Sequence, residues 1–186
     1  MSDFTIIYGC MFSGKTTKLI ELFNDSPCMP NEKIAVKPLI DNRYLAHSIN
    51  SHDGVRLNGH RISKPEELYP LVNEQVKEVF IDEVQFMGKQ IYDIILGLMI
   101  QDIRVVASGL DLDYLGRPFG DMPRIISLAR NKMQLFAKCG ICQKQADRTF
   151  RTVEDDNLML VGHGDIYQAR CKTHWEEGMQ GMRSTG

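Results

Sequence analysis

The chain has 186 residues, 43% of them hydrophobic, which allows one core of ordinary size or that core with a small appendage. Its 22 basic and 24 acidic side chains leave a net charge of −2 without a basic run, so a polynucleotide is not expected as a partner. No signal-peptide pattern or bilayer-length apolar stretch is present, which predicts a cytoplasmic protein without a membrane partner. Five cysteines in a reducing compartment indicate free thiols or metal ligands rather than disulfides.

Short apolar strands alternate with helical patterns, which predicts an α/β fold with a parallel sheet covered by helices. Residues 39–62 are polar and contain three of the five histidines, so we expect a long loop there. Residues 63–66 have capping-box spacing, although Pro70 limits the helix that follows. Strands are expected at residues 4–8, 34–36, 79–81, 103–110 and 133–138, and helices after residue 16, at 89–100 and at 123–129.

A phosphate-binding loop is the strongest motif in the chain. Residues 9–16 match G-x-x-x-x-G-K-[ST] at every defined position, between an apolar strand and an amphipathic helix. In such loops backbone N–H groups and the helix N-terminus surround the phosphates, Lys15 neutralises their oxygens and Thr16 reaches Mg²⁺. The alternative is a glycine-rich turn with a chance lysine. The pattern predicts a nucleoside triphosphate site formed by Gly9, Met11, Phe12, Ser13, Gly14, Lys15, Thr16 and Thr17.

Two carboxylates, Asp82 and Glu83, end the apolar run at residues 79–81. In a phosphate-loop fold we expect this strand beside the first one, with ligands at the carboxyl ends of the strands. Asp82 is then predicted to hold Mg²⁺, usually through water. Because successive strand residues point to opposite sides, Glu83 is free to face the acceptor or an attacking water as a base. Alternatively, both carboxylates are solvated residues in a turn.

Two ligand pairs occur late in the chain: Cys139 with Cys142, and Cys171 with His174, each with two residues inside the pair. Two such pairs can hold one tetrahedral zinc ion and close the intervening segment into a small lobe. Four protein ligands leave no open coordination position, so we predict a structural zinc site rather than a catalytic one. The alternative is a set of unrelated thiols.

Together these motifs resemble type II thymidine kinases, from about residue 4 to about residue 175. The likeness rests on several segments in the family's order. They are residues 9–16, Asp-Asn-Arg-Tyr at 41–44, Ile-Asp-Glu-Val-Gln-Phe at 81–86, Gly-Leu-Asp at 109–111, Arg-Pro-Phe-Gly at 117–120, and the two metal-ligand pairs.

The resemblance implies a reaction. Members of this family transfer the γ-phosphoryl group of ATP to the 5′-hydroxyl of thymidine, a step of nucleotide salvage. The glutamate at the place of Glu83 takes the proton from that hydroxyl. Lys15, Thr16 and Mg²⁺ would stabilise the transferring group, with Arg43 as a further cation. Asp41 would place Arg43 or the metal.

The resemblance also implies how thymidine is bound. Aromatic residues at such spacing are more often core than ligand contacts, so only the family pattern supports these positions. A flexible lasso at residues 160–164 would pair its backbone with the thymine edge. The implied contacts are Met11, Phe86, Leu110, Tyr114, Phe119 and Tyr167, and in the lasso Leu160, Val161, Gly162, His163 and Gly164.

The expected organisation has three parts: a kinase domain at residues 1–137, a zinc-ribbon-like lobe with the lasso at 138–179, and a disordered tail at 180–186. The family further implies a homotetramer that is inhibited by thymidine triphosphate. Two other functions stay open. One is a kinase for another deoxynucleoside, and the other is a phosphate-loop ATPase with a nucleic-acid-binding zinc ribbon, against which the near-neutral charge argues.

Overall fold

A six-stranded parallel sheet forms the centre of the computed structural model, which describes residues 2–39, 48–50, 56–153 and 166–184. The strand order is β5-β2-β6-β7-β1-β8, and each neighbouring pair runs parallel. The α/β fold class predicted from the alternation of strands and helices is therefore confirmed. The strands are β1 (Phe4–Tyr8), β2 (Lys33–Pro38), β5 (His60–Ile62), β6 (Glu78–Ile81), β7 (Arg104–Gly109) and β8 (Asn131–Gln134).

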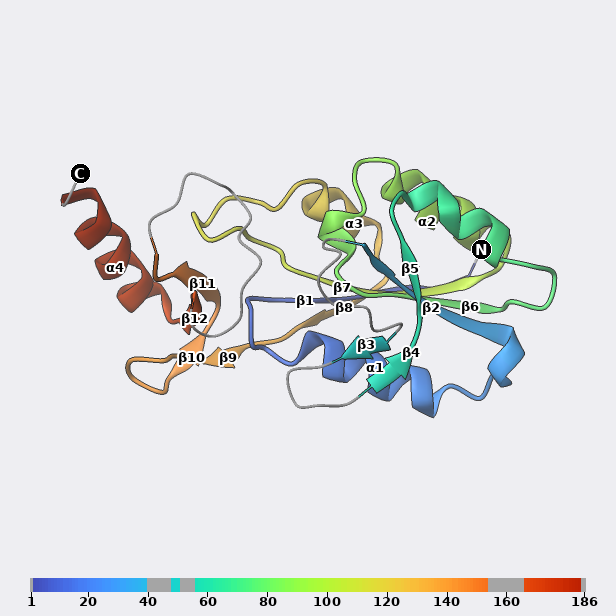
Figure 1. Ribbon diagram of the computed structural model, residues 1–186, viewed down its shortest axis with the longest axis horizontal. Coiled ribbons are helices and arrows are strands. Elements are labelled where there is room, and N and C mark those ends of the chain that lie inside the picture. The colour runs from blue at the N-terminus through green and yellow to red at the C-terminus, as the bar shows by residue number, and fades with distance from the viewer. Residues whose placement is uncertain (1, 40–47, 51–55, 154–165, 185–186) are drawn as a thin grey trace.

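Helices cover both faces of this sheet (Figure 1). Helix α1 (Lys15–Asp25) lies on one face, while α2 (Ile91–Ile100) and α3 (Met122–Leu128) lie on the other. The adjacent residues Ile6 and Ile7 of β1 are both fully buried and belong to different cores, because successive strand side chains point to opposite faces. Burial on both faces explains why the central strands β1, β6 and β7 read as nearly continuous apolar runs.

A smaller lobe lies at one end of the sheet (Figure 1). It contains two antiparallel pairs, β9 (Ala137–Lys138) with β10 (Gln145–Ala146), and β11 (Arg148–Arg151) with β12 (Tyr167–Arg170). Helix α4 (Lys172–Ser184) follows β12 and packs on β11 through Gly178, where a β-carbon would lie 2.5 Å from the Phe150 ring. The disordered tail expected from residue 180 is therefore wrong for residues 180–184, which belong to this helix.

Three further expectations need correction. The strand at 79–81, now β6, pairs with β2 and β7, so it is not the neighbour of β1. The predicted strand at 133–138 is two elements, because β8 ends at Gln134 and residues 137–138 pair antiparallel in the small lobe. The expected loop at 39–62 includes β5, and a hairpin of β3 (Ser48–Asn50) with β4 (Arg56–Asn58).

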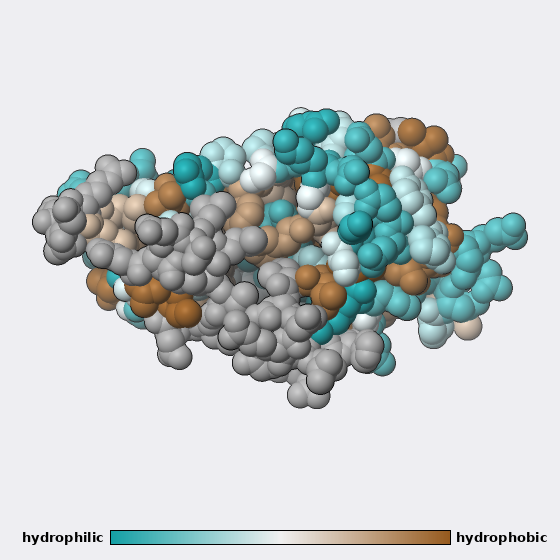
Figure 2. All heavy atoms as spheres, turned by 45° about the horizontal axis from the view of Figure 1, so that its top comes forward, coloured by the Kyte–Doolittle hydropathy of each residue, from teal (hydrophilic) through white to brown (hydrophobic). Residues whose placement is uncertain are grey.

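Three short 3₁₀ turns complete the described chain: η1 (Pro30–Glu32), η2 (Pro65–Leu71) and η3 (Val84–Phe86). The broken helix expected near Pro70 is η2, but the capping box is absent, since the Ser63 N–H donates to the Glu67 carboxylate instead. Among the described helices, none combines the length and apolar character of a membrane span. On the face shown in Figure 2, hydrophobic residues form separate groups among hydrophilic ones.

Candidate active site

The phosphate loop begins where β1 ends, and its backbone explains its glycines. Gly9 has φ +146°, and a β-carbon there would lie 2.1 Å from the carbonyl oxygen of Leu135. Gly14 adopts the left-handed conformation with φ +81° and precedes the first residue of α1. Phe12 is also left-handed, with φ +65°, although it carries a side chain. The motif glycines are thus needed for a tight path between strand and helix.

Lys15 is the first residue of α1 and is buried inside the loop. Its Nζ donates to the Cys10 carbonyl oxygen at 2.7 Å, and Ser13 Oγ donates to the same oxygen at 2.8 Å. Burial lowers the pKa of Lys15, and the Glu83 carboxylate is the strongest of the charges that oppose this. The carboxylates of Glu83 and Asp82 therefore favour the charged form of the buried Lys15 amine.

Thr16 and Asp82, the two residues predicted to serve Mg²⁺, lie together. Thr16 Oγ1 is 3.2 Å from both carboxylate oxygens of Asp82, and Ser108 on β7 donates a second hydrogen bond to Oδ1. Burial is the main cause that raises the pKa of Asp82 to about 6, and repulsion from the Glu83 carboxylate is the second. The hydrogen bonds from Ser108 and Thr16 act in the opposite direction and lower this pKa. Ser108 could not be predicted from the sequence, because an isolated serine in an apolar strand belongs to no motif.

Glu83 leaves the strand in a way that alternation did not predict. Strand β6 ends at Ile81, and Glu83 adopts a left-handed conformation, with φ +53° and ψ +43°, at the start of η3. The side chain is therefore separated from that of Asp82 by this backbone turn rather than by strand pleating. Its Oε2 accepts a hydrogen bond from Gln85 Nε2 at 2.5 Å. No role was assigned to Gln85 from the sequence, although it stands in the D-E-x-Q-F motif.

Several residues predicted to bind thymidine make defined contacts. Phe86 and Phe119 pack edge to face with ring centroids 5.3 Å apart. The Arg151 guanidinium lies 3.8 Å from the Tyr114 ring centroid and donates to its hydroxyl at 2.9 Å. The Leu110 N–H donates to Gln85, so this residue lies beside the Glu83 network.

Of the remaining predicted residues, some belong to the part of the chain that the structure describes and the others lie outside it. Tyr167 is buried in β12, 8% exposed, opposite Arg151 in the strand pair. The Met11 N–H donates to Thr149 Oγ1 at 3.0 Å, which ties the phosphate loop to β11. Thr17 follows Thr16 in α1. Outside the described residues lie Asp41, Arg43 and the lasso residues Leu160, Val161, Gly162, His163 and Gly164.

The predicted zinc ligands come together in the small lobe. The ligand atoms of Cys139, Cys142, Cys171 and His174 all lie within 4.8 Å of one another. Cys171 precedes α4 and His174 lies in its first turn, so their spacing places both on one face. Burial opposes ionisation of Cys139, but hydrogen bonds from backbone N–H groups lower its pKa to about 6. A Cys₃His set in which one thiol ionises readily is compatible with a structural zinc ion.

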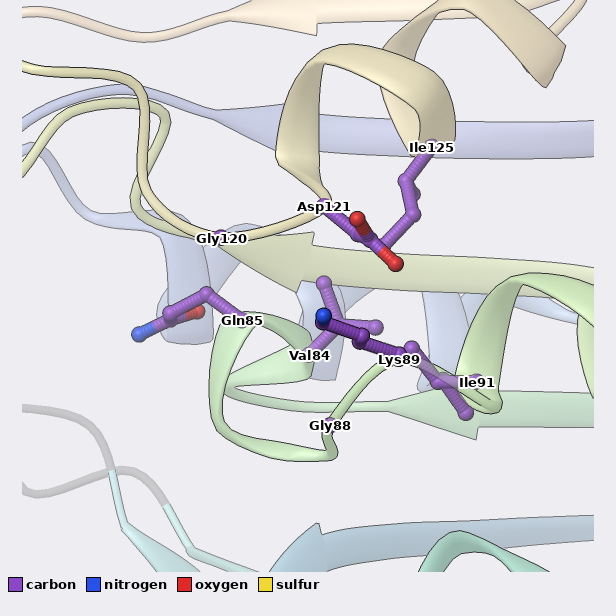
Figure 3. A pocket seen from close by; sticks show the side chains of 8 residues that line it. All are labelled: Val84, Gln85, Gly88, Lys89, Ile91, Gly120, Asp121 and Ile125. Atoms are coloured by element: carbon purple, nitrogen blue, oxygen red, sulfur yellow. The ribbon is translucent and has the colours of Figure 1, made fainter.

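A cavity of about 240 Å³ lies beside the D-E-x-Q-F turn (Figure 3). It is lined by Val84, Gln85, Gly88, Lys89, Ile91, Gly120, Asp121 and Ile125. This lining contains none of the residues predicted for phosphate, thymidine or metal binding. We therefore do not assign the cavity to the candidate active site, whose residues follow the carboxyl ends of β1 and β6.

Known proteins of one family match this chain over most of its length. The sequence model of the family described as "Thymidine kinase" matches residues 2–175. The thymidine kinase of Bdellovibrio bacteriovorus is 36% identical over 171 residues, covering 92% of this chain and 84% of that protein. The thymidine kinase of Coprothermobacter proteolyticus is 36% identical over 177 residues, covering 92% and 89%. The phosphate loop, the paired carboxylates and the Cys₃His cluster thus stand in a chain that belongs to the thymidine kinase family.

Proposed function

We propose that the chain transfers the γ-phosphoryl group of ATP to the 5′-hydroxyl of thymidine, with Glu83 as the general base. Kinase chemistry on thymidine follows from the family to which the chain belongs. The roles that we propose rest on one observation: Lys15, Asp82 and Glu83 lie close enough at one end of the sheet for their charges to act on one another. These are the three charges that phosphoryl transfer needs near the phosphates, the metal and the acceptor hydroxyl.

The phosphate loop supplies the donor site. The residues from Gly9 to Thr17 would enclose the phosphates through their backbone N–H groups and the N-terminus of α1. Lys15 would exchange its bond to the Cys10 carbonyl for the β and γ oxygens, where it offsets the charge that builds up during transfer. Arg43 is proposed as a second cation on the basis of the family pattern alone.

Thr16 and Asp82 fit a magnesium site. Both place oxygen atoms within hydrogen-bond distance of each other at the end of β6, and oxygen ligands are those that Mg²⁺ prefers. When bound, Mg²⁺ would offset negative charge on the phosphates. Ser108 supports this role, because its hydrogen bond to Oδ1 orients the Asp82 carboxylate toward Thr16.

Glu83 would take the proton of the 5′-hydroxyl as the oxygen attacks the γ-phosphorus. Glu83 stands after the end of β6, in a left-handed turn, and Asp82 accepts hydrogen bonds from Thr16 and Ser108, so Glu83 would serve the acceptor while Asp82 serves the metal. Thymidine would lie against Phe86, Leu110, Tyr114 and Phe119, with Met11 near the base, the lasso at residues 160–164 on its polar edge and Tyr167 over the pocket.

The zinc lobe would hold the acceptor pocket in shape. Cys139, Cys142, Cys171 and His174 would bind the ion, and β11 and α4 connect the lobe to the loop around Tyr114. A homotetramer and inhibition by thymidine triphosphate are further proposals, which rest on the family resemblance alone.

The experiment is an initial-rate assay with ATP and Mg²⁺ in which thymidine, deoxyuridine, deoxycytidine and deoxyguanosine are offered separately. We expect thymidine monophosphate as the main product and Glu83→Gln to lower turnover by about 10²–10⁴ with ATP binding retained. Near-normal turnover of Glu83→Gln would remove the proposed base. Preferred phosphorylation of another nucleoside would instead overturn the pocket assignment.

A further inference from the structure

The amide of Gln85 is buried and hydrogen-bonded at both ends. Gln85 is 9% exposed and belongs to the η3 turn that begins after Glu83. Burial of an amide is costly unless both its oxygen and its nitrogen find partners. Here Oε1 accepts from the Leu110 N–H at 3.1 Å, and Nε2 donates to Glu83 Oε2 at 2.5 Å.

These two partners fix which way the amide points. The Leu110 backbone nitrogen can only donate, so it requires the amide oxygen on its side. The amide nitrogen must then face Glu83, where a carboxylate oxygen accepts its hydrogen bond. A charge-assisted hydrogen bond of this kind is stronger and more directional than one between neutral groups.

The space around Gln85 leaves little freedom for the amide. A β-carbon at Gly109, the last residue of β7, would lie 2.7 Å from Gln85 Oε1 and 2.9 Å from a Val84 methyl carbon. In Figure 3 the Gln85 side chain extends away from the group formed by Lys89, Ile91 and Ile125. The amide is therefore wedged between the end of β7 and the Glu83 side chain.

We propose that Gln85 is a positioning residue that holds the Glu83 carboxylate where it accepts the proton of the acceptor hydroxyl. The proposal rests on the proposed role of Glu83 as the base. A glutamate side chain has several rotamers, and a base must lie about 2.6–3.2 Å from the group it deprotonates. The Gln85 hydrogen bond restrains Oε2 and leaves the second oxygen of the carboxylate for the substrate.

The first test replaces Gln85 by methionine, which has a similar length but no amide. We expect kcat to fall about 10- to 100-fold, because a displacement of about 1 Å at a reacting group costs that much. The KM for ATP should stay within about twofold, since Gln85 does not touch the phosphate loop. Gln90→Met is the matched control, because Gln90 is exposed and its side chain caps no helix. The control should keep the parent kcat.

A double-mutant cycle with Glu83→Gln separates positioning from a merely structural role. If Gln85 acts through Glu83, adding Gln85→Met to Glu83→Gln should change the single-turnover rate by less than about threefold. A further 10-fold loss or more in the double variant would show that Gln85 acts independently and would overturn the proposal. Near-normal turnover of Glu83→Gln alone is a different result, which overturns the base itself.

A second variant keeps the test informative if Gln85→Met does not fold. Gly109→Ala displaces the amide without removing it, because the new methyl group would contact Oε1. We expect a lower kcat with an unchanged KM for ATP here too. Parent kcat in either folded variant contradicts the positioning role.

Discussion

Trp175 packs directly on Gly116, so that a β-carbon at residue 116 would lie 2.9 Å from Cη2 of the indole ring. The indole N–H also lies 3.1 Å from the Tyr114 carbonyl oxygen and 3.2 Å from that of Thr149. Trp175 follows His174 of the metal cluster in the sequence. This one side chain therefore joins the zinc lobe to the loop that carries Tyr114.

Replacing Trp175 by phenylalanine should loosen this junction. Phenylalanine is shorter and lacks the outer ring atoms that contact Gly116, and it has no N–H for Tyr114 and Thr149. The lost hydrogen bonds alone cost about 1–2 kcal/mol of unfolding free energy. Because the affected loop is proposed to bind thymidine, the KM for thymidine should rise by more than the KM for ATP. Steady-state kinetics with each substrate varied in turn measures this, and equal changes in both KM values would contradict it.

Removal of the metal should act through the same junction. Cys171→Ser is expected to abolish binding of one zinc ion per chain and to raise the KM for thymidine. Cys28→Ser is the matched control, because Cys28 is not part of the cluster, and it should keep its zinc. Metal content by mass spectrometry, together with kinetics before and after chelation, measures both effects. Full activity in the metal-free protein would show that the lobe does not need zinc.

Asp82 should destabilise the metal-free protein at neutral pH. Its pKa is raised in the fold from 3.8 to about 6, so the unfolded chain ionises first as the pH rises. The free energy of unfolding therefore falls as the pH rises from about 4 to about 6. Above pH 6, ionised Asp82 lowers the free energy of unfolding by an amount on the order of 2–3 kcal/mol. In chelator, Asp82→Asn should unfold at a higher temperature than the parent at pH 7.5, with a smaller difference at pH 4.5. Kinase activity should be lost. An equal difference at both pH values would contradict the burial argument.

Gly9 should tolerate no side chain. In Gly9→Ala the new methyl carbon would meet the Leu135 carbonyl oxygen at 2.1 Å, so the loop or β8 must shift. We expect a loss of ATP binding and a lower unfolding temperature. Gly97→Ala is the contrasting control, because Gly97 lies in α2 with open space around it and alanine favours the helix by roughly 0.5–1 kcal/mol. Thermal unfolding of both variants, with and without ATP, tests the pair.

The sequence predicted those features that depend on local spacing. The phosphate loop requires a set order of glycine, lysine and threonine on consecutive residues, and the zinc ligands come in pairs within single turns. The helix at 89–100 was also predicted, because its apolar residues repeat with the helical period and the structure has α2 at Ile91–Ile100. These patterns are visible without knowing which strands are neighbours.

The tertiary structure decided which residues and strands that are far apart in the chain become neighbours. The strand before Asp82 was expected beside β1, but β7 lies between them, and this places Ser108 on the Asp82 carboxylate. The hydrogen bond from Gln85 to Glu83 depends on a left-handed backbone at a non-glycine residue, which no residue pattern signals. Chain order and composition thus determined the fold class and the chemistry of the groups. Only packing, which brings β7 against β6 and turns Glu83 out of the strand, decided which of those groups touch.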